Sequence, residues 1–270
     1  MKLVVKIGGS ILKNGAPDLN LIDDLKSVFS ENRLVLVHGG GDEVTAVASR
    51  MGKKQVFVMS PRGFRSRYTD KETLDIYVMV MAGRISKEIV STLLRFGLPA
   101  VGISGVDGGL LRAERKRKLI IIDERGRKRA IPGGYTGKIV EVNAGLLNML
   151  LDSGFLPVVS PLALGMEYEI LNVDGDRAAS YVAGALKADR LILLTDVEGL
   201  ILDGELRREV SASQVEDRLS KIGPGMITKV YAALEALKMG VGEVLISSGL
   251  AEKPVTSALK GRIGTRIYRG

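Results

Sequence analysis

The sequence opens with Met1-Lys-Leu-Val-Val-Lys-Ile-Gly-Gly-Ser10, and this stretch decides the fold class. Apart from Lys6, the residues from Leu3 to Ile7 form a short apolar run of the length that a buried strand needs. The run ends at Gly8-Gly9, where the chain can turn tightly and present amide N–H groups to a ligand. Lys6 precedes this pair at the carboxyl end of the strand, where open α/β sheets bind ligands. The residues alone also fit an edge-strand lysine whose ammonium group reaches water.

Strands and helices alternate along almost the whole chain. Further apolar runs predict strands at 34–37, 100–103, 156–159, 191–195 and 243–247. Helical patterns and caps predict helices at 17–30, 42–51, 70–95, 144–153 and 211–222. They also predict an alanine-rich helix that ends at Leu186 and a helix that carries Lys229 and runs to Met239. This alternation predicts an α/β fold, a three-layer αβα sandwich with a central, mainly parallel sheet. Because no linker separates the halves, we expect one domain over 1–270, with an N-terminal lobe (1–155) and a C-terminal lobe (156–270).

The composition excludes several classes of protein. The chain has 270 residues, of which 46% are hydrophobic and 4% aromatic, so its core must be built from aliphatic side chains. It contains no cysteine, which excludes disulfides and thiol chemistry and suits the cytoplasm. No apolar run approaches the ~20 residues of a membrane span, and no signal-peptide pattern follows Met1. We therefore expect a cytoplasmic protein that does not interact with membranes.

Positive charge is concentrated in one segment. The net charge is +8, and the stretch from Arg112 to Arg129 holds nine Lys/Arg against three acidic residues. An apolar run, Leu119-Ile-Ile-Ile122, and a turn at Asp123-Glu-Arg-Gly126 lie within it. These features predict a basic β-hairpin inserted into the α/β pattern. Either the hairpin is a solvated charged loop or it binds an acidic partner.

A glycine-rich junction follows the second strand at His38-Gly-Gly-Gly41. A strand–glycine–helix junction offers free amide groups and the positive end of a helix dipole to an anion. The sequence matches neither the P-loop nor the dinucleotide-binding fingerprint. His38 is the one histidine in the chain, and we assign it no catalytic role.

Three arginines occupy the loop from Ser60 to Asp70. An arginine just before a helix cap can hold a carboxylate with two hydrogen bonds, whereas the other arginines are expected at the surface. Thr69-Asp-Lys-Glu72 fits a capping box that opens the helix to Arg95. That helix has more apolar surface than one face requires, so we expect part of it to contact a second subunit in a homodimer.

Six motifs occur in a fixed order: Lys6-Ile-Gly-Gly9, His38-Gly-Gly-Gly41, Arg67-Tyr-Thr-Asp70, Asn172-Val-Asp-Gly-Asp176, Thr195-Asp-Val-Glu-Gly199 and Gly225-Met-Ile-Thr-Lys229. Together they resemble the amino acid kinase family, in particular its acetylglutamate kinase branch. The resemblance spans nearly the whole chain. It implies an N-terminal lobe that binds an amino-acid derivative and forms the dimer contact, and a C-terminal lobe that binds ATP.

The resemblance also assigns roles to residues of this chain. It implies that Lys6 and Lys229 hold the transferring phosphoryl group and that Asp176 orients both lysines. The ATP and phosphate site would comprise Gly8, Gly9, Thr195, Asp196, Gly199, Gly225 and Met226. The amino-acid substrate would be held by Gly40, Gly41, Arg67 and Asn172. Mg²⁺ would be carried by the nucleotide, so no residue is assigned as a metal ligand.

Within the family, the Arg67-Tyr-Thr-Asp70 form and the basic hairpin look most like the kinases that act on a carrier-bound substrate. Their substrate is α-aminoadipate or glutamate attached through its amino group to a small acidic protein, LysW. The hairpin residues that would then dock the carrier are Arg115, Lys116, Arg117, Lys118, Arg127, Lys128 and Arg129. The two amino acids differ by one methylene, so the sequence does not separate them. The arginine loop is longer than in ordinary acetylglutamate kinases, which leaves the roles of Arg62 and Arg65 open.

Other functions stay open at this point. N-acetylglutamate kinase would use the same chemistry on a free substrate, but it leaves the basic hairpin unexplained. Aspartokinase or glutamate 5-kinase would bring an additional domain for which the chain has no room. A non-catalytic amino-acid sensor or a nucleic-acid-binding protein on the same fold is a remote alternative. Against it, both lysines and the aspartate are present, and the basic segment lacks interleaved aromatic residues.

Overall fold

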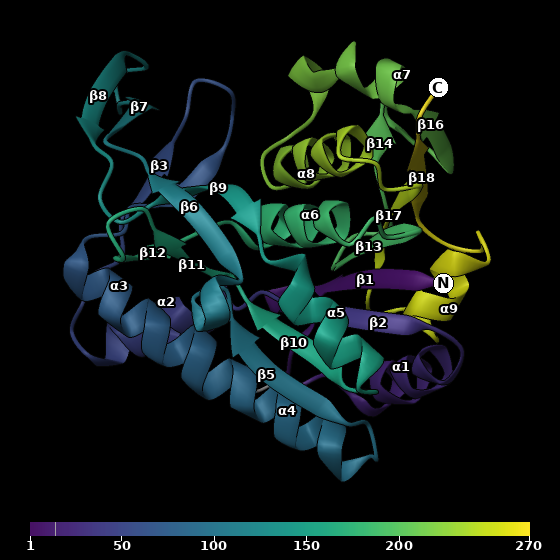
Figure 1. Ribbon diagram of the computed structural model, residues 1–270. Helices are drawn as coiled ribbons and strands as arrows, with labels where there is room; N and C mark the ends of the chain where they lie inside the picture. Colours follow the sequence, from purple (N-terminus) through teal and green to yellow (C-terminus); the bar gives the residue numbers. More distant parts are fainter. Residues whose placement is uncertain (14) are drawn as a thin grey trace.

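A computed structural model describes residues 1–13 and 15–270 of the chain. An eight-stranded sheet runs through its centre, with β13 and β1 in the middle (Figure 1). In order across the sheet, the strands are β16 (Glu209–Ser211), β18 (Thr265–Tyr268), β17 (Glu243–Ser248), β13 (Arg190–Thr195), β1 (Lys2–Ile7), β2 (Arg33–His38), β10 (Leu156–Ser160) and β5 (Ala100–Ser104). Every neighbouring pair is parallel except β17 with β18. The predicted sheet, mainly parallel and continuous, is therefore confirmed.

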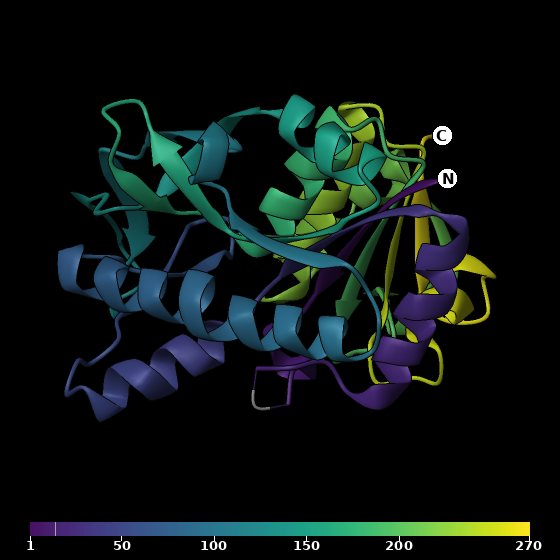
Figure 2. The ribbon, with the colours of Figure 1, turned by 60° about the horizontal axis from the view of Figure 1, so that its bottom comes forward.

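Side chains of β1 alternate between two hydrophobic cores, one on each face of this sheet. Val4 belongs to the core covered by α5 (Ala144–Asp152), α6 (Gly175–Ala185) and α8 (Met226–Lys238). Leu3 and Val5 belong to the core covered by α1 (Leu19–Glu31), α2 (Gly41–Arg50), α4 (Ser86–Arg95) and α9 (Pro254–Leu259). Burial on both faces explains why the strand sequence is almost continuously apolar. The three-layer αβα sandwich is confirmed (Figure 1 and Figure 2).

One long helix packs along the second of these faces. It begins as α3 (Lys71–Val78), passes through a π-helical segment, η2 (Met79–Ile85), and continues as α4. Figure 2 shows it as a single continuous rod across the front of the view. Its N-cap is Asp70, whose side chain accepts a hydrogen bond from Thr73 N at 2.8 Å, so the capping residue lies one position later than the sequence pattern predicted. Met79 in the π segment stays 53% exposed.

The structure contains three smaller sheets among the described residues. One has the order β12 (Ile170–Asn172), β11 (Leu162–Gly165), β6 (Leu111–Arg115) and β9 (Gly137–Val142), and another pairs β14 (Ile201–Leu202) with β15 (Glu205–Leu206). The third has the order β4 (Arg65–Arg67), β3 (Phe57–Met59), β7 (Lys118–Ile122) and β8 (Lys128–Pro132). The predicted basic hairpin is β7–β8. The β3–β4 hairpin occupies much of the predicted arginine loop. The sequence did not predict this hairpin, because three-residue strands are too short to show an alternating pattern.

Short helical turns complete the described part of the chain. They are η1 (Gly9–Ile11), η3 (Asp107–Gly109), α7 (Ala212–Glu216) and η4 (Leu219–Lys221). The helix predicted for 211–222 is thus interrupted after Glu216, although its Ser211/Gln214 capping box forms. None of the helices formed by residues 1–13 and 15–270 is both long and apolar enough to span a membrane.

Candidate active site

The carboxyl ends of three neighbouring strands meet at one edge of the central sheet. Ile7, at the end of β1, pairs with His38 on β2 and with Leu194 on β13. The two glycine motifs and the Thr195-Asp196 pair follow these positions directly. This edge is where parallel sheets place their ligands, and the structure brings the sequence motifs together there.

Two lysines and one aspartate from distant parts of the chain form a buried cluster at this edge. Lys6 Nζ on β1 lies 2.8 Å from Asp176 Oδ1 as an ion pair. Lys229 Nζ on α8 lies 3.0 Å from the other carboxylate oxygen, Oδ2, and donates a hydrogen bond to it. The side chains are 9% (Lys6), 7% (Asp176) and 15% (Lys229) exposed. The aspartate therefore fixes the separation of the two ammonium groups.

The charges in this cluster stabilise one another. Burial alone would raise the pKa of Asp176, but the ammonium groups of Lys6 and Lys229 outweigh it and lower the pKa to about 2. Burial would lower the pKa of Lys229, yet the Asp176 carboxylate raises it above its ordinary value. The three side chains together carry two positive charges and one negative charge, and the carboxylates of Asp174 and Asp196 also act on Lys229. The cluster is suited to an anionic group such as a phosphoryl group in transfer.

The local sequence explains how Asp176 reaches this position. Asn172 ends β12, and Asp174 is the N-cap of α6, where its side chain accepts a hydrogen bond from Arg177 N at 2.9 Å. Asp176 then lies in the first turn of α6, where a negative charge also interacts favourably with the helix dipole. The Asn-Val-Asp-Gly-Asp motif is thus a strand end, a cap and a helix start.

The two glycine motifs contact each other through their backbones. A Cβ atom on Gly9 would lie 2.8 Å from Gly40 N, and one on Gly39 would lie 2.9 Å from Gly9 N. Gly40 has φ +154°, and a Cβ atom there would lie 2.1 Å from the Ile85 side chain. Side chains are therefore excluded where the loops meet. The Gly8 amide donates to Leu194 O at 3.0 Å, so its N–H is already bonded. Gly8 can therefore let a ligand come close to the backbone but does not offer it this N–H.

His38 supports this loop from inside the protein. Its Nε2 lies 2.8 Å from Ser160 Oγ and its Nδ1 lies 3.0 Å from Gly39 O. Burial lowers the pKa of His38 to about 4, so the ring is neutral at neutral pH. The geometry gives His38 a structural place beneath the glycine loop.

Arg67 on β4 is held beside the glycine loop by several partners. Its Nη2 donates to Gly41 O at 2.7 Å and to Thr45 Oγ1 at 3.0 Å, and its Nη1 donates to Gln55 Oε1. Its guanidinium also lies over the Phe57 ring, 4.8 Å from the ring centre. These bonds use both N–H groups of Nη2 and one of Nη1, so Nε–H and the second Nη1–H are left as two separate single donors for a ligand. The sequence reasoning missed Thr45, which lies one helical turn after Gly41, and Gln55, for which the sequence offers no signal.

Thr69 connects Arg67 to Asn172. Thr69 Oγ1 accepts a hydrogen bond from Asn172 Nδ2 at 2.9 Å, and Thr69 O accepts one from Tyr135 N at 2.7 Å. Two buried polar atoms near this network, Gln55 Nε2 and Thr136 Oγ1, have no partner among the described residues. Because unpaired buried polar groups are costly, these two atoms are available to bond a water molecule or a polar ligand.

Most of the residues assigned to the nucleotide belong to the end of β13, the loop after it and the start of α8. Thr195 ends β13, and its Oγ1 donates to Asp196 Oδ1 at 3.0 Å. Gly225 has φ +84° and is the N-cap of α8, which begins at Met226, three residues before Lys229. Gly199 packs against Thr265, whose Oγ1 would lie 2.6 Å from an added Cβ atom. Gly199 therefore has a packing role in addition to its assigned one.

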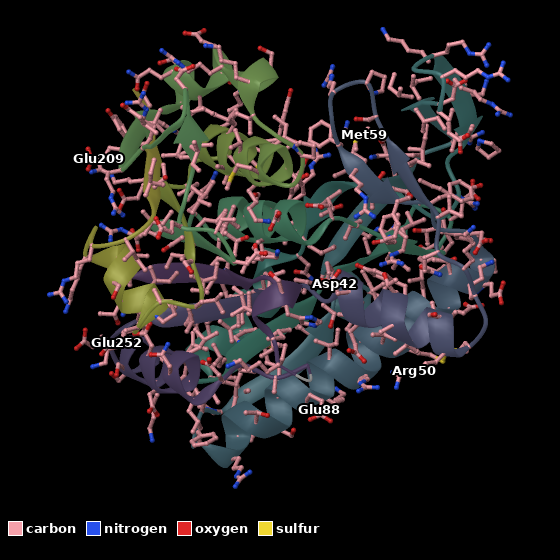
Figure 3. All side chains as sticks on the ribbon, turned by 180° about the vertical axis from the view of Figure 1, so that it is seen from behind. Asp42, Arg50, Met59, Glu88, Glu209 and Glu252 are labelled. Carbon is pink, nitrogen blue, oxygen red and sulfur yellow. The ribbon has the colours of Figure 1, made fainter. Side chains whose placement is uncertain are left out.

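Two contacts connect the β3–β4 hairpin (here called the arginine hairpin) and α6 to α8, the helix that carries Lys229. Phe64, in the turn between β3 and β4, lies edge-on against Tyr231 of α8 with ring centres 4.9 Å apart. Arg177 of α6 donates through Nε to Glu235 Oε2 of α8 at 2.9 Å. Figure 3, in which Met59 is labelled, shows the β3–β4 hairpin between the β7–β8 hairpin and α8. Neither contact was predicted from the sequence.

The seven basic residues assigned to docking lie in different environments. Arg115, on β6, donates from Nε to Gly134 O at 2.7 Å and stacks over Tyr135. The half-buried Lys116 lies close enough to Arg177 of α6 for that charge, after burial, to lower its pKa. Arg127 pairs with Asp123 inside the hairpin turn. The other docking residues, Arg117, Lys118, Lys128 and Arg129, are exposed.

Across residues 1–13 and 15–270, no three His, Cys, Asp or Glu side chains are grouped so as to hold a metal ion.

The family assignment follows from a match over most of the sequence. A model of the amino acid kinase family matches residues 1–248. The chain belongs to the amino acid kinase family. Among similar proteins, a LysW-aminoadipate/LysW-glutamate kinase from Saccharolobus solfataricus is 47% identical to this amino acid kinase and covers 99% of it and 100% of the relative. A protein from Cenarchaeum symbiosum to which the same activity is provisionally given is 55% identical and covers 95% of this chain and 96% of the relative.

Solved structures agree with the fold of this amino acid kinase. N-acetylglutamate synthase from Neisseria gonorrhoeae, complexed with coenzyme A and N-acetyl-glutamate, has a TM-score of 0.80 and 27% identity, and the match covers 100% of this chain and 59% of that one. The protein smu.665 from Streptococcus mutans has a TM-score of 0.79 and 25% identity, with 100% and 99% covered.

The lysine–aspartate cluster predicts which step each substitution impairs. We expect Lys6→Ala and Lys229→Ala to lower kcat by ~10²–10³-fold, since each removes a charge that stabilises the phosphoryl group in transfer. Asp176→Asn should lower kcat similarly by releasing both lysines. Steady-state kinetics and thermal unfolding measure activity and folding separately. Lys238→Ala, at the other end of α8, is the matched control. Near-normal kcat in all three variants would contradict the assignment.

Proposed function

We propose that this chain transfers the γ-phosphoryl group of ATP to the side-chain carboxylate of α-aminoadipate or glutamate carried on LysW. The products are ADP and an acyl phosphate on the carrier-bound amino acid. The observation that carries the proposal is the Lys6–Asp176–Lys229 cluster, which lies at the same sheet edge as the glycine loops. Relatives with 46–55% identity over nearly the whole chain, named for this activity, support the choice of acceptor.

The chemistry needs positioning and charge more than a base. A side-chain carboxylate is ionised at neutral pH, so one of its oxygens can attack the γ-phosphorus directly. The bond from this phosphorus to the β–γ bridging oxygen breaks, and ADP leaves with the electron pair. Two anions must be aligned and the charge on the transferred group stabilised. The ammonium groups of Lys6 and Lys229 are placed for this role by Asp176.

The acceptor would bind on the Arg67 side of the cluster. Arg67 keeps Nε–H and one Nη1–H, either of which can donate to the α-carboxylate of the amino acid, and Asn172 keeps its side-chain oxygen for the amide formed with the carrier. Gly40 and Gly41 would allow the substrate to approach the backbone. The unpaired groups at Gln55 and Thr136 would complete its polar contacts.

ATP would bind on the other side of the cluster. Gly8 and Gly9 would approach its phosphates, and Thr195, Asp196, Gly199, Gly225 and Met226 would surround the nucleotide. Mg²⁺ would be held by the phosphate oxygens of ATP, where it neutralises part of their charge. The N-terminal lobe (1–155) would thus serve the acceptor and the C-terminal lobe (156–270) the nucleotide.

We also propose a homodimer. The long helix leaves Met79 and Leu94 more than half exposed, which is consistent with a further contact along it.

A free N-acetylglutamate is the alternative acceptor. The likeness to a synthase structure that holds N-acetyl-glutamate favours it. A phosphorylation assay with four acceptors separates the two functions: carrier-bound aminoadipate, carrier-bound glutamate, free N-acetylglutamate and free N-acetylaminoadipate. The proposal requires kcat/KM to be highest for a carrier-bound acceptor. A higher value for free N-acetylglutamate would replace it with the alternative.

Arg67→Lys tests the acceptor site. Lysine keeps the charge but loses the planar guanidinium that is held by Gly41, Thr45 and Gln55 and donates to the acceptor, so we expect KM for the acceptor to rise roughly 10- to 100-fold. KM for ATP should change little. Arg33→Lys, which changes an exposed arginine paired with Asp152, is the control. A larger change in KM for ATP than for the acceptor would place Arg67 on the wrong side of the cluster.

Salt dependence tests the role of the basic hairpin. The variant replaces Arg115, Lys116, Arg117, Lys118, Arg127, Lys128 and Arg129 with glutamine. Long-range attraction sets the association rate and is screened within ~8–10 Å at moderate salt. Wild-type kcat/KM for the carrier-bound substrate should therefore fall steeply with salt, and the variant should be slow and insensitive to salt.

Turnover of free N-acetylaminoadipate is the control for this variant, since a small acceptor does not need the hairpin. Equal losses on both substrates would mean that the hairpin supports the fold. No loss on either would make it a solvated charged loop.

A further inference from the structure

The two hairpins outside the central sheet are one continuous surface. Met59 of β3 pairs with Ile122 of β7, which joins the β3–β4 hairpin to the basic β7–β8 hairpin. The sheet therefore has the order β4-β3-β7-β8. Arg65 and Arg67, on β4, are at one edge of this sheet and Lys128, on β8, is at the other. A partner that docks across this joint would contact both hairpins.

The strand register assigns each side chain to one of two faces. Directly paired residues share a face, and so do residues two positions apart on one strand. The pairs Arg65–Met59, Met59–Ile122 and Ile122–Lys128 therefore share a face with Arg67. Lys118 belongs to the same face, four positions before Ile122. We call it the Arg67 face; its members used below are Arg65, Arg67, Met59, Ile122, Lys118 and Lys128.

The opposite face holds different residues. Arg129 pairs with Ile121, one position from Ile122, so it points away from the Arg67 face. Lys128 and Arg129 are adjacent in sequence and carry the same charge, yet they lie on opposite sides of the sheet. Charge density along the sequence does not reveal this difference.

The Arg67 face is suited to an acidic protein. Phe57, paired with Arg67, is 36% exposed, and Ile120, two positions before Ile122, is 50% exposed. Around these apolar side chains, Arg65, Lys118 and Lys128 are exposed, and the four strands contain no Asp or Glu. Arg65 lies over the Phe57 ring, 3.9 Å from its centre, which fixes its charge above the surface. An apolar centre with charged residues around it is typical of protein interfaces.

This face also leads to the acceptor site. Arg67 is on it, and the Arg67 guanidinium is bonded to Gly41 and Thr45 of α2 beside the glycine loop. A carrier on the Arg67 face could therefore extend its substrate to Arg67 without crossing the sheet. A carrier on the Arg129 face would have to reach around an edge.

We propose that the Arg67 face of the β4-β3-β7-β8 sheet, including Arg65 of the arginine hairpin, is the docking surface for the acidic carrier. The inference rests on the proposed function and narrows it. Arg65 joins the docking residues, whereas Arg129 is outside them. Arg115 and Arg127 are already bonded to Gly134 and Asp123, and Lys116 lies close to Arg177 of α6.

Three charge-matched variants test this inference on the full-length protein: Arg65→Gln, Lys128→Gln and Arg129→Gln. The readout is kcat/KM for carrier-bound aminoadipate at low and high salt. We expect Arg65→Gln and Lys128→Gln each to lower it about two- to fivefold at low salt, with a smaller loss at high salt. Arg129→Gln should stay close to the wild type. Ile120→Ser should lower kcat/KM by a factor that salt does not change, because it removes apolar contact.

Thermal unfolding and KM for ATP, both expected to be unchanged, show that each variant is folded. Equal losses for Lys128→Gln and Arg129→Gln would overturn the inference, because the hairpin would then act as a diffuse charge. An unchanged Arg65→Gln would overturn it too, since docking would then not extend to β4. If the wild-type enzyme prefers free N-acetylglutamate, the proposed function fails, and this inference fails with it.

Discussion

The ion pairs of Asp176 with Lys6 and Lys229 are the interaction on which the rest of the site depends. Two buried ammonium groups need a carboxylate close by, because an unpaired buried charge is strongly destabilising. Meeting this need brings β1, α6 and α8 together. Ser180 Oγ of α6 donates to Ala232 O of α8 at 2.7 Å, and Arg177 pairs with Glu235 across the same two helices. These contacts between α6 and α8 fix the position of Asp176 relative to Lys229.

The acceptor side depends on a second set of contacts around Arg67. Its guanidinium donates hydrogen bonds to α2 and Gln55 and stacks on the Phe57 ring of β3. The same hairpin reaches α8 through Phe64 and Tyr231, two residues beyond Lys229. Arg67 and the lysine–aspartate cluster are therefore attached to one connected framework. A substrate bound at Arg67 would meet a phosphoryl group held at a fixed place.

Local sequence patterns predicted most of the framework and much of the site. The apolar run before Gly8 predicted the central strand, and the resemblance to the amino acid kinase family implied that Lys6, Asp176 and Lys229 act together. Contacts between distant, non-periodic segments were not predictable. Gln55 lies in a polar stretch without periodicity, and the pairing of Met59 with Ile122 joins strands too short to recognise. The basic segment was read as one patch because a sequence shows the density of charge, whereas the face of each residue follows only from the strand register.

We propose that the cluster of Lys6, Asp176 and Lys229 stabilises the phosphoryl group during transfer, in addition to any part it has in binding the nucleotide. Calorimetric binding of ADP with aluminium fluoride, a mimic of that group, tests this most directly when it is compared with binding of ADP alone. With a carboxylate acceptor present, the account predicts that Asp176→Asn weakens binding of the mimic at least about 100-fold. Binding of ADP alone should change by no more than a few-fold. An equal loss of affinity for both ligands would contradict the account, because the cluster would then serve ground-state binding alone.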